Sequence, residues 1–345
     1  MRASIISILP SSVSKPRWKA SLFVSVMALC TLSGYATSMI GWSNFPLSVN
    51  DLTSYLFAFD EGNMLHQILA TLRAPRTYAG LLIGASLAVS GVLMQGLTRN
   101  PLASPSILGI NAGAVCFMAF ASIGVPLFSQ LNPIINAVLG ALLSGGSVML
   151  LGGFFSARSH PLRLVLAGIA ISALLMGLTR ASVILADDMA YSLLQWLTGS
   201  LSRVDSQQWQ QLWPFATLGL VLAIGLARNL NLLALGEDIA VGLGGNIRLT
   251  RLIGGLVVVL LAGTSVAIAG PIGFIGLLVP HLVRPIIGHN NHILIPISAL
   301  CGATLMTWSD ALSRAIAFPA ETPVGVITAL LGTPCFISIA MRKSL

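Results

Sequence analysis

The stretch at residues 73–114 reads RAPRTYAGLLIGASLAVSGVLMQGLTRNPLASPSILGINAGA. Two arginines, Arg73 and Arg76, lead into a long apolar run that is rich in glycine. A polar segment with two prolines follows at residues 98–105, and a second apolar run then begins. This pattern predicts two membrane-spanning helices joined by a short helix-breaking connection.

The composition of the whole chain agrees with a membrane protein. It has 345 residues, of which 55% are hydrophobic and 8% charged, whereas a soluble domain carries about 25% charged residues. So few charges cannot cover a water-exposed surface, so lipid must be the solvent for most of the chain. The 34 glycines suit closely packed membrane helices. The net charge of +8 is therefore interpreted through membrane topology and not as a nucleic-acid interface.

A helix needs about 20 apolar residues to cross the hydrocarbon core, and ten segments approach that length. We therefore expect an all-α polytopic membrane protein with spans at residues 20–40, 75–96, 107–128, 133–155, 162–186, 209–228, 251–269, 271–288, 293–311 and 323–341. The eighth span is short, is separated from its predecessor by Pro271, and contains Pro280 and Pro285. Such broken helices occur in membranes where other protein shields the backbone.

The basic residues predict the orientation of these spans. With ten spans both termini lie on one side, and most of the 18 Lys and Arg residues fall on that side. They are Arg2, Lys15, Arg17, Lys19, Arg99, Arg158, Arg163, Arg228, Arg248, Arg251, Arg284, Arg342 and Lys343. The positive-inside rule then predicts a cytoplasmic tail at 1–19, one transmembrane domain at 20–341 and a cytoplasmic tail at 342–345.

Three connecting segments are long. The outer loop at 41–74 follows the first span, and the outer loop at 187–208 is apolar enough for a short interfacial helix. In the inner loop at 229–250, residues 232–243 predict a short helix with Leu235, Ile239 and Leu243 on one face. The glycines at 242, 244 and 245 are expected to end it. The apolar face predicts either a docking partner or a helix lying on the membrane surface.

No catalytic constellation appears in the chain. A nucleotide-binding loop needs a lysine after glycine, and none of the three lysines follows a glycine. The four cysteines are isolated in apolar runs, and the five histidines are scattered. We therefore expect no enzyme activity, no bound metal and no cofactor on this chain.

Several segments together resemble the FecCD-type permeases, the membrane subunits of BtuC-like type II ABC importers. The resemblance covers roughly residues 70–340 and rests on 73–114, 166–180, 236–251, 269–288 and 317–337. It implies ten helices per subunit, a bacterial inner-membrane location, a second permease subunit, two ATPase subunits and a periplasmic binding protein. ATP and Mg would bind on the ATPase subunits. Whether the second permease subunit is a copy or a paralogue stays open, although the resemblance favours a paralogue.

The resemblance also implies roles for individual residues. Arg73, Arg76 and Arg314 match outer arginines that meet acidic residues of the binding protein, and Asn100 and Leu102 match the inner gate. The coupling helix that enters the ATPase matches residues 236–246, with Glu237, Asp238, Gly242 and Gly244 facing that partner. Two alternatives compete with docking: lipid-headgroup anchoring by Arg73 and Arg76, and an Asp310–Arg314 pair on one helix end.

Residues 178–209 are most similar to ferric dicitrate permeases, so ferric dicitrate is the expected cargo. Another siderophore, haem or vitamin B12 are alternatives within the same importer class. Arg180 lies inside the fifth span, where a charge usually faces a cavity or a partner. It is expected either to line the substrate pathway, to pair with Asp187 or Asp188, or to extend its charge to the outer membrane interface. An ion-driven secondary transporter is the rival class, but Asp310 is the only candidate acid for carrying protons within a span.

Overall fold

The computed structural model describes residues 17–154, 161–186 and 190–342, and the regular structure within them is entirely helical. The α-helices are α1 (Arg17–Ile40), α2 (Val49–Phe57), α3 (Met64–Ile68), α4 (Ala74–Thr98), α5 (Ile110–Ser122), α6 (Pro126–Ser129), α7 (Pro133–Leu151), α8 (Pro161–Leu185), α9 (Ala190–Leu197), α10 (Ser206–Gly225), α11 (Ala227–Ala234), α12 (Glu237–Gly242), α13 (Ile247–Ala269), α14 (Ile275–Ile287), α15 (Asn291–Ala317) and α16 (Val324–Arg342). A π-helical turn, η1 (Leu69–Arg73), precedes α4, and a 3-10 turn, η2 (Pro105–Leu108), precedes α5.

Every predicted span coincides with a helix, but α5 and α14 are shorter than the spans predicted at 107–128 and 271–288. Six helices in the described ranges are long and apolar enough to cross a membrane, or seven if the bent pair α10–α11 counts as one span. The remaining three, α5, α14 and α16, are shorter apolar helices. Helix α5 starts only after Gly109, whose φ of 70° interrupts the helix, and it ends before Gly124 with φ of 75°.

The outer loop predicted at 41–74 is largely helical. It contains α2 and α3, and α3 continues through η1 into α4 as one stretch of 35 residues, Met64–Thr98. Arg73 therefore lies within a continuous helix and not in a loop, which corrects the predicted boundary. In the second of the long outer loops, the short helix predicted within 187–208 is α9.

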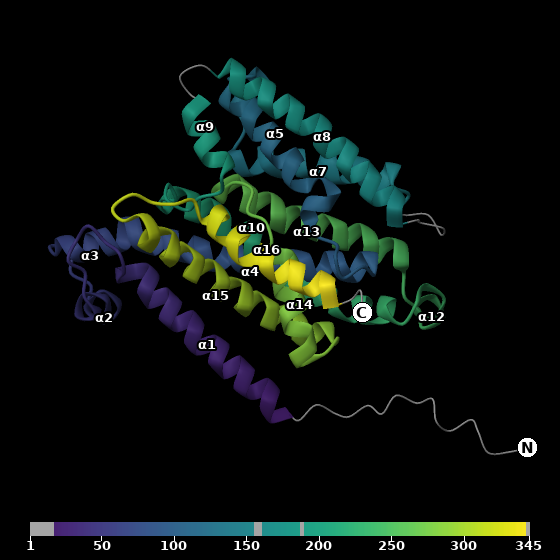
Figure 1. Ribbon diagram of the computed structural model, residues 1–345, viewed down its shortest axis with the longest axis horizontal. Helices are drawn as coiled ribbons and strands as arrows, with labels where there is room; N and C mark the ends of the chain where they lie inside the picture. The colour runs from purple at the N-terminus through teal and green to yellow at the C-terminus, as the bar shows by residue number, and fades with distance from the viewer. Residues whose placement is uncertain (1–16, 155–160, 187–189, 343–345) are drawn as a thin grey trace, which may run out of the picture.

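Helix α4 forms the centre of the bundle, with α10, α13, α14 and α15 packed around it (Figure 1). In the stretch Met64–Thr98, which includes α4, 83% of an 18-residue apolar segment is buried, whereas the corresponding segments of α1 and α8 are 17% and 11% buried. Close approach depends on glycine: a Cβ on Gly91 would overlap the carbonyl oxygen of Gly276, and a Cβ on Gly84 would overlap that of Gly302. The weakly buried α1 and α8 lie on opposite sides of the bundle (Figure 1).

The predicted break at Pro271 is confirmed. Helix α13 ends at Ala269, Gly270 has φ of 72°, and the non-glycine Phe274 has φ of 67° before α14 begins. Within the predicted N-terminal tail, residues 1–16 lie outside the described ranges, and α1 begins at Arg17, before the end of the tail predicted at residue 19.

Candidate functional site

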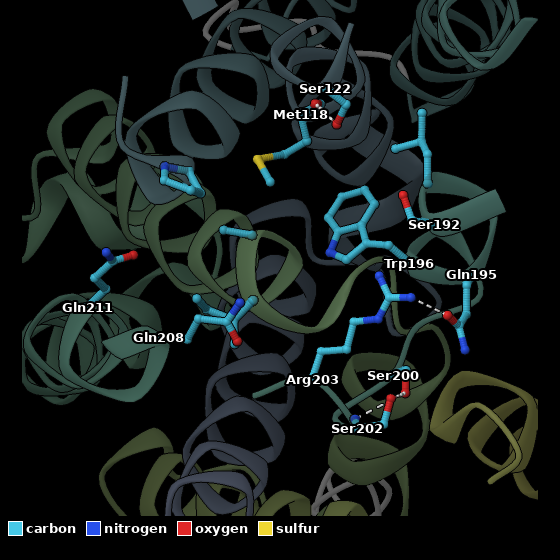
Figure 2. A pocket seen from close by; sticks show the side chains of 14 residues that line it. Met118, Ser122, Ser192, Gln195, Trp196, Ser200, Ser202, Arg203, Gln208 and Gln211 are labelled. Atoms are coloured by element: carbon cyan, nitrogen blue, oxygen red, sulfur yellow. Dashed lines mark hydrogen bonds between the residues drawn. The ribbon is translucent and has the colours of Figure 1, made fainter. Parts of the chain in front are cut away.

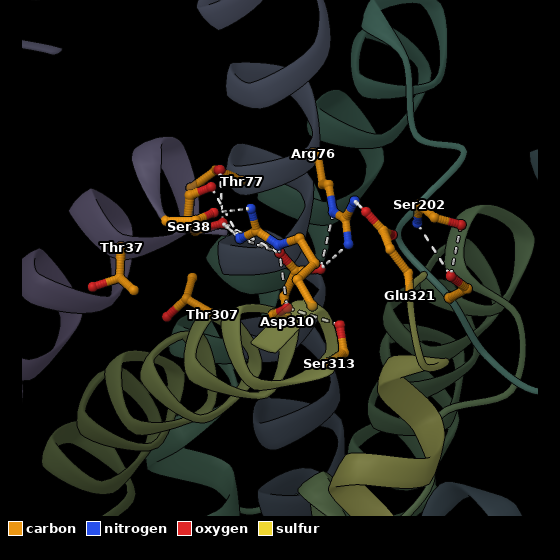
Figure 3. A network of polar contacts seen from close by, with 12 residues as sticks. Thr37, Ser38, Arg76, Thr77, Ser202, Thr307, Asp310, Ser313 and Glu321 are labelled. Carbon is orange, nitrogen blue, oxygen red and sulfur yellow. Dashed lines mark hydrogen bonds and ion pairs between the residues drawn. The ribbon is translucent and has the colours of Figure 1, made fainter. Parts of the chain in front are cut away.

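Two polar clusters lie at the predicted outer ends of the helices. One borders a cavity formed by α9, the loop after it and the start of α10 (Figure 2). The other is a network of ion pairs where α1, α4 and α15 meet (Figure 3). The network contains two of the three arginines predicted to dock a binding protein.

Arg76 and Arg314 share one carboxylate. Arg76 Nη2 donates to Asp310 Oδ1 at 2.8 Å, and Arg314 Nη2 donates to Asp310 Oδ2 at 3.2 Å. Arg76 Nη1 also reaches Glu321 Oε1 at 2.9 Å, in the segment before α16. Ser38 on α1 donates to Asp310 and accepts from Arg314. The four charges balance, which is what buried charges require.

In this conformation Arg76 and Arg314 are too deeply buried to contact a docking protein at the surface. Arg76 is 8% exposed, Arg314 1% and Asp310 1%. Arg314 also donates to the backbone carbonyl oxygens of Ser38 and Gly41, at 3.0 Å each, so its guanidinium is well satisfied. The Asp310–Arg314 pair, the predicted alternative to docking by Arg314, is therefore present.

Arg73 differs from the other two arginines. It is half-buried, and in the described part of the chain no carboxylate lies within ion-pair distance of it. A guanidinium in this position can still form a two-bond contact with an incoming carboxylate.

Arg180 borders a cavity of about 630 Å³ between α5, α8 and α9. Its side chain is exposed, and hydroxyl and amide groups from Ser106, Asn111, Ser172 and Thr179 share the lining. Asn111 Nδ2 donates to Ser106 at 3.1 Å, while its buried Oδ1 has no partner among the described residues. The alternative pairing with Asp187 or Asp188 falls outside the described ranges. The described lining is mostly apolar; Arg180 is its one charged residue, the four hydroxyl and amide side chains supply its polar groups, and no acidic residue is present.

A neighbouring cavity of about 250 Å³ lies where α14 begins. It shares Ser106 and Asn111 with the Arg180 cavity and adds Ser104, Phe274 and Phe336. The predicted gate residues do not line either cavity. Instead, Asn100 Oδ1 accepts from the backbone N–H of Leu102 at 3.0 Å, which tightens the turn that follows α4.

The predicted single coupling helix at 232–243 is two helices. Gly236, with φ of 116°, separates α11 from α12, because this backbone conformation is strained for residues other than glycine. Helix α12 ends at Gly242, and Gly244 follows with φ of 81°, so the predicted glycine terminus is confirmed. Leu235, Ile239 and Leu243 are all more than half exposed.

The Glu237 carboxylate is held in an ion pair within the chain. Arg251 Nη2 donates to Glu237 Oε1 at 2.6 Å, and the Arg251 guanidinium lies 5.4 Å from the centre of the Phe154 ring. Asp238 is exposed. Glu237 therefore positions α12 against α13, whereas Asp238 and the apolar side chains present the accessible face.

The sequence profile of the FecCD transport family matches residues 12–342. The chain belongs to this family. Two relatives are each 42% identical: the Fe(3+)-citrate import permease YfmD of Bacillus subtilis, over 86% of this chain and 87% of that protein, and the Fe(3+) dicitrate permease FecC of Escherichia coli, over 89% and 92%. The iron(3+)-hydroxamate permease FhuB of Bacillus subtilis is 37% identical over 95% of this chain and 85% of that protein.

The fold comparison agrees. A solved inward-facing structure of a metal-chelate type ABC transporter matches with a TM-score of 0.76 and 28% identity, covering 93% of this chain and 99% of that one. This FecCD chain is accordingly a multi-pass membrane permease and the pore component of a ferric-chelate ABC importer.

Sequence reasoning missed several features of this FecCD permease. Ser104, Ser106 and Asn111 line the cavities, whereas the sequence indicated only a helix-breaking connection at Ser104 and no role for Ser106 or Asn111. The Arg76–Asp310 pair joins residues 234 positions apart, so no local spacing could indicate it. The available signal was that Arg76 and Asp310, which carry opposite charges, each lie near the end of a predicted span.

Proposed function

We propose that this permease moves ferric dicitrate from the periplasm to the cytoplasm of a bacterium. The observation that carries the proposal is Arg180 on the wall of a cavity with hydroxyl and amide groups and no acidic residue in its described lining. Such a wall gives an anionic chelate a favourable potential. The two citrate-named relatives support the same cargo.

The proposed complex contains a second permease subunit, two ATPase subunits that bind ATP and Mg, and a periplasmic binding protein. We place the subunit in the inner membrane with both termini cytoplasmic, because basic residues concentrate on the side of the termini. The weakly buried helices α1 and α8 leave large apolar surfaces for lipid or a partner subunit.

Docking of the binding protein is assigned to Arg73. The family resemblance gives Arg76 and Arg314 the same role, but each would first have to leave Asp310, which is buried between them. We propose that these two arginines instead hold α1, α4 and α15 in register beneath the docking surface. Arg73 projects from the same helical stretch as Arg76 and so depends on that register.

Coupling to the ATPase is assigned to α12 and its exposed apolar side chains. An apolar face on the cytoplasmic side needs a partner to cover it, and the break at Gly236 lets α12 leave the line of α11. Gly242 and Gly244, with open space around them, would allow close approach by the partner. Asn100 and Leu102 stay our candidates for the inner gate, as the tight turn below the cavities.

An ion-driven transporter is a poorer match to these contacts. The only acid within a predicted span, Asp310, is paired with two arginines. An aspartate held between two guanidinium groups is a weak proton carrier, because protonation would remove the carboxylate that pairs with Arg314 and leave Arg76 with Glu321 alone.

Uptake of radiolabelled iron by cells lacking the gene tests the proposed cargo. Iron is supplied as citrate, as a hydroxamate chelate or as a catecholate chelate, and labelled vitamin B12 is supplied separately. We expect loss of the citrate signal alone and its return on complementation. Loss of another cargo with normal citrate uptake would reject ferric dicitrate but leave the importer class intact.

A further inference from the structure

The cavity formed by α9, the loop after it and the start of α10 has a volume of about 260 Å³ (Figure 2). It is bordered by α9, the loop at 198–205, the starts of α7 and α10 and the predicted outer ends of α5 and α13, and it is partly open to solvent. No lining residue is shared with the Arg180 cavity. Along α9, Leu193 and Trp196 face this cavity, whereas Leu194 and Leu197 face the other.

The lining is unusually polar for a protein that is 55% hydrophobic. Glutamine side chains come from positions 195, 208 and 211, serine side chains from positions 122, 192, 200 and 202, and Arg203 supplies one positive charge (Figure 2). The described lining contains no carboxylate. Asp205, the acid nearest in sequence, is occupied elsewhere because it accepts from the backbone N–H of Gln208 at the start of α10.

The hydrogen-bonding capacity of this lining is only partly used. Arg203 donates through Nη2 to Gln195 Oε1, and a guanidinium has five N–H donors. Gln208 Oε1 is buried without a partner among the described residues. Buried polar atoms are normally paired, so this cavity offers a cationic donor and an unused amide acceptor in one small space.

We propose that this cavity is a binding site for a small, metal-free hydroxycarboxylate anion. Its carboxylate would accept two hydrogen bonds from Arg203. Its hydroxyl would pair with the Gln208 amide, and a hydroxyl can donate or accept, so either amide orientation is served. At about 260 Å³ the cavity lies just below the roughly 300–1,000 Å³ typical of drug-sized sites, which suits a small anion.

The position of the site gives it a consequence for transport. Helix α9 forms one wall of each cavity, so an anion bound behind α9 favours the position of α9 seen in this structure. The site rests on its own lining chemistry and does not depend on which chelate crosses at Arg180.

Calorimetric titration of the full-length permease in lipid nanodiscs tests the proposal. The probes are metal-free citrate and tricarballylate, which has the same three carboxylates but no hydroxyl. We expect citrate to bind more tightly than tricarballylate. Arg203→Gln should weaken citrate binding by at least about tenfold, because it removes charge-assisted hydrogen bonds. Gln208→Leu should abolish the preference for citrate.

Arg163→Gln is the matched control, because Arg163 is an exposed arginine at the opposite end of the bundle; it should bind citrate as the unaltered protein does. An unchanged citrate Kd in Arg203→Gln would overturn the proposal. So would the absence of citrate binding at millimolar concentration. Loss of binding in Arg180→Gln but not in Arg203→Gln would place the anion in the other cavity and equally overturn it.

Discussion

Arg76 on α4 and Asp310 on α15 form a buried ion pair with a 2.8 Å contact, although 234 positions separate them in the chain. The same carboxylate holds Arg314, and Ser38 ties the pair to α1. One aspartate therefore joins three helices near the predicted outer surface. Its neighbours are the arginines that sequence resemblance associates with docking.

Asp310→Asn should destabilise the fold strongly, because it leaves Arg76 and Arg314 buried beside a neutral amide. Breaking a buried ion pair by removing one partner typically costs about 3–5 kcal/mol. Thermal unfolding of the purified permease measures the effect. Glu61→Gln is the control, since Glu61 is exposed and should leave the melting temperature unchanged. Equal melting temperatures for both variants would show that the network does not stabilise the fold.

Arg73→Glu should weaken docking of the periplasmic binding protein by at least about tenfold, because it replaces a favourable interfacial charge contact with a repulsive one. Surface plasmon resonance with the importer in nanodiscs measures the affinity. Arg163→Glu makes the same charge change at the predicted cytoplasmic end and should leave docking intact. An unaltered affinity in Arg73→Glu would remove Arg73 from the docking surface.

Ile239→Asp should abolish co-purification with the ATPase subunits. Ile239 is 54% exposed on α12, and a charge there cannot enter an apolar interface without desolvation. Ile239→Met keeps an apolar side chain of similar size and should retain the complex. If the aspartate variant still co-purifies with the ATPase, α12 is not the coupling element.

Gly91→Ala should separate α4 from α14, because the added methyl group would overlap the carbonyl oxygen of Gly276. We expect a loss of about 1–3 kcal/mol, as for other overpacked sites. Gly146→Ala on α7 is the matched control, because no neighbouring atom of the described chain lies within 4 Å of the place its methyl group would take. Thermal unfolding should distinguish the two, and identical curves would mean that the α4–α14 contact relaxes freely.

Hydropathy is sufficient to locate the helices along the sequence, because a long apolar segment is stable in the lipid core as a helix whichever helices it packs against. Ten apolar segments are predicted as spans, and each is helical. The break at Pro271 is also visible in the sequence, because proline lacks the N–H that continues a helix. Helix length is less predictable, since left-handed glycines such as Gly109 and Gly124 shorten α5 at both ends.

The polar contacts of the candidate site could not be predicted in the same way. The partners of Arg76 lie on α15 and before α16, far along the chain. Only the Asp310–Arg314 pair could be predicted from sequence spacing, because its two residues lie four apart on one helix. The split at Gly236 was hidden for a related reason: apolar spacing continues across it, although the backbone does not.

Transport of radiolabelled ferric dicitrate into proteoliposomes, with ATP hydrolysis followed in parallel, tests the central claim most directly. We predict that Arg180→Gln lowers the transport rate at least about tenfold, since it removes the positive charge facing the anionic cargo. Assembly and ATP hydrolysis should persist, and Arg163→Gln should transport normally. An undiminished rate in Arg180→Gln, with equal amounts of assembled importer, would contradict the claim that the chelate passes this arginine.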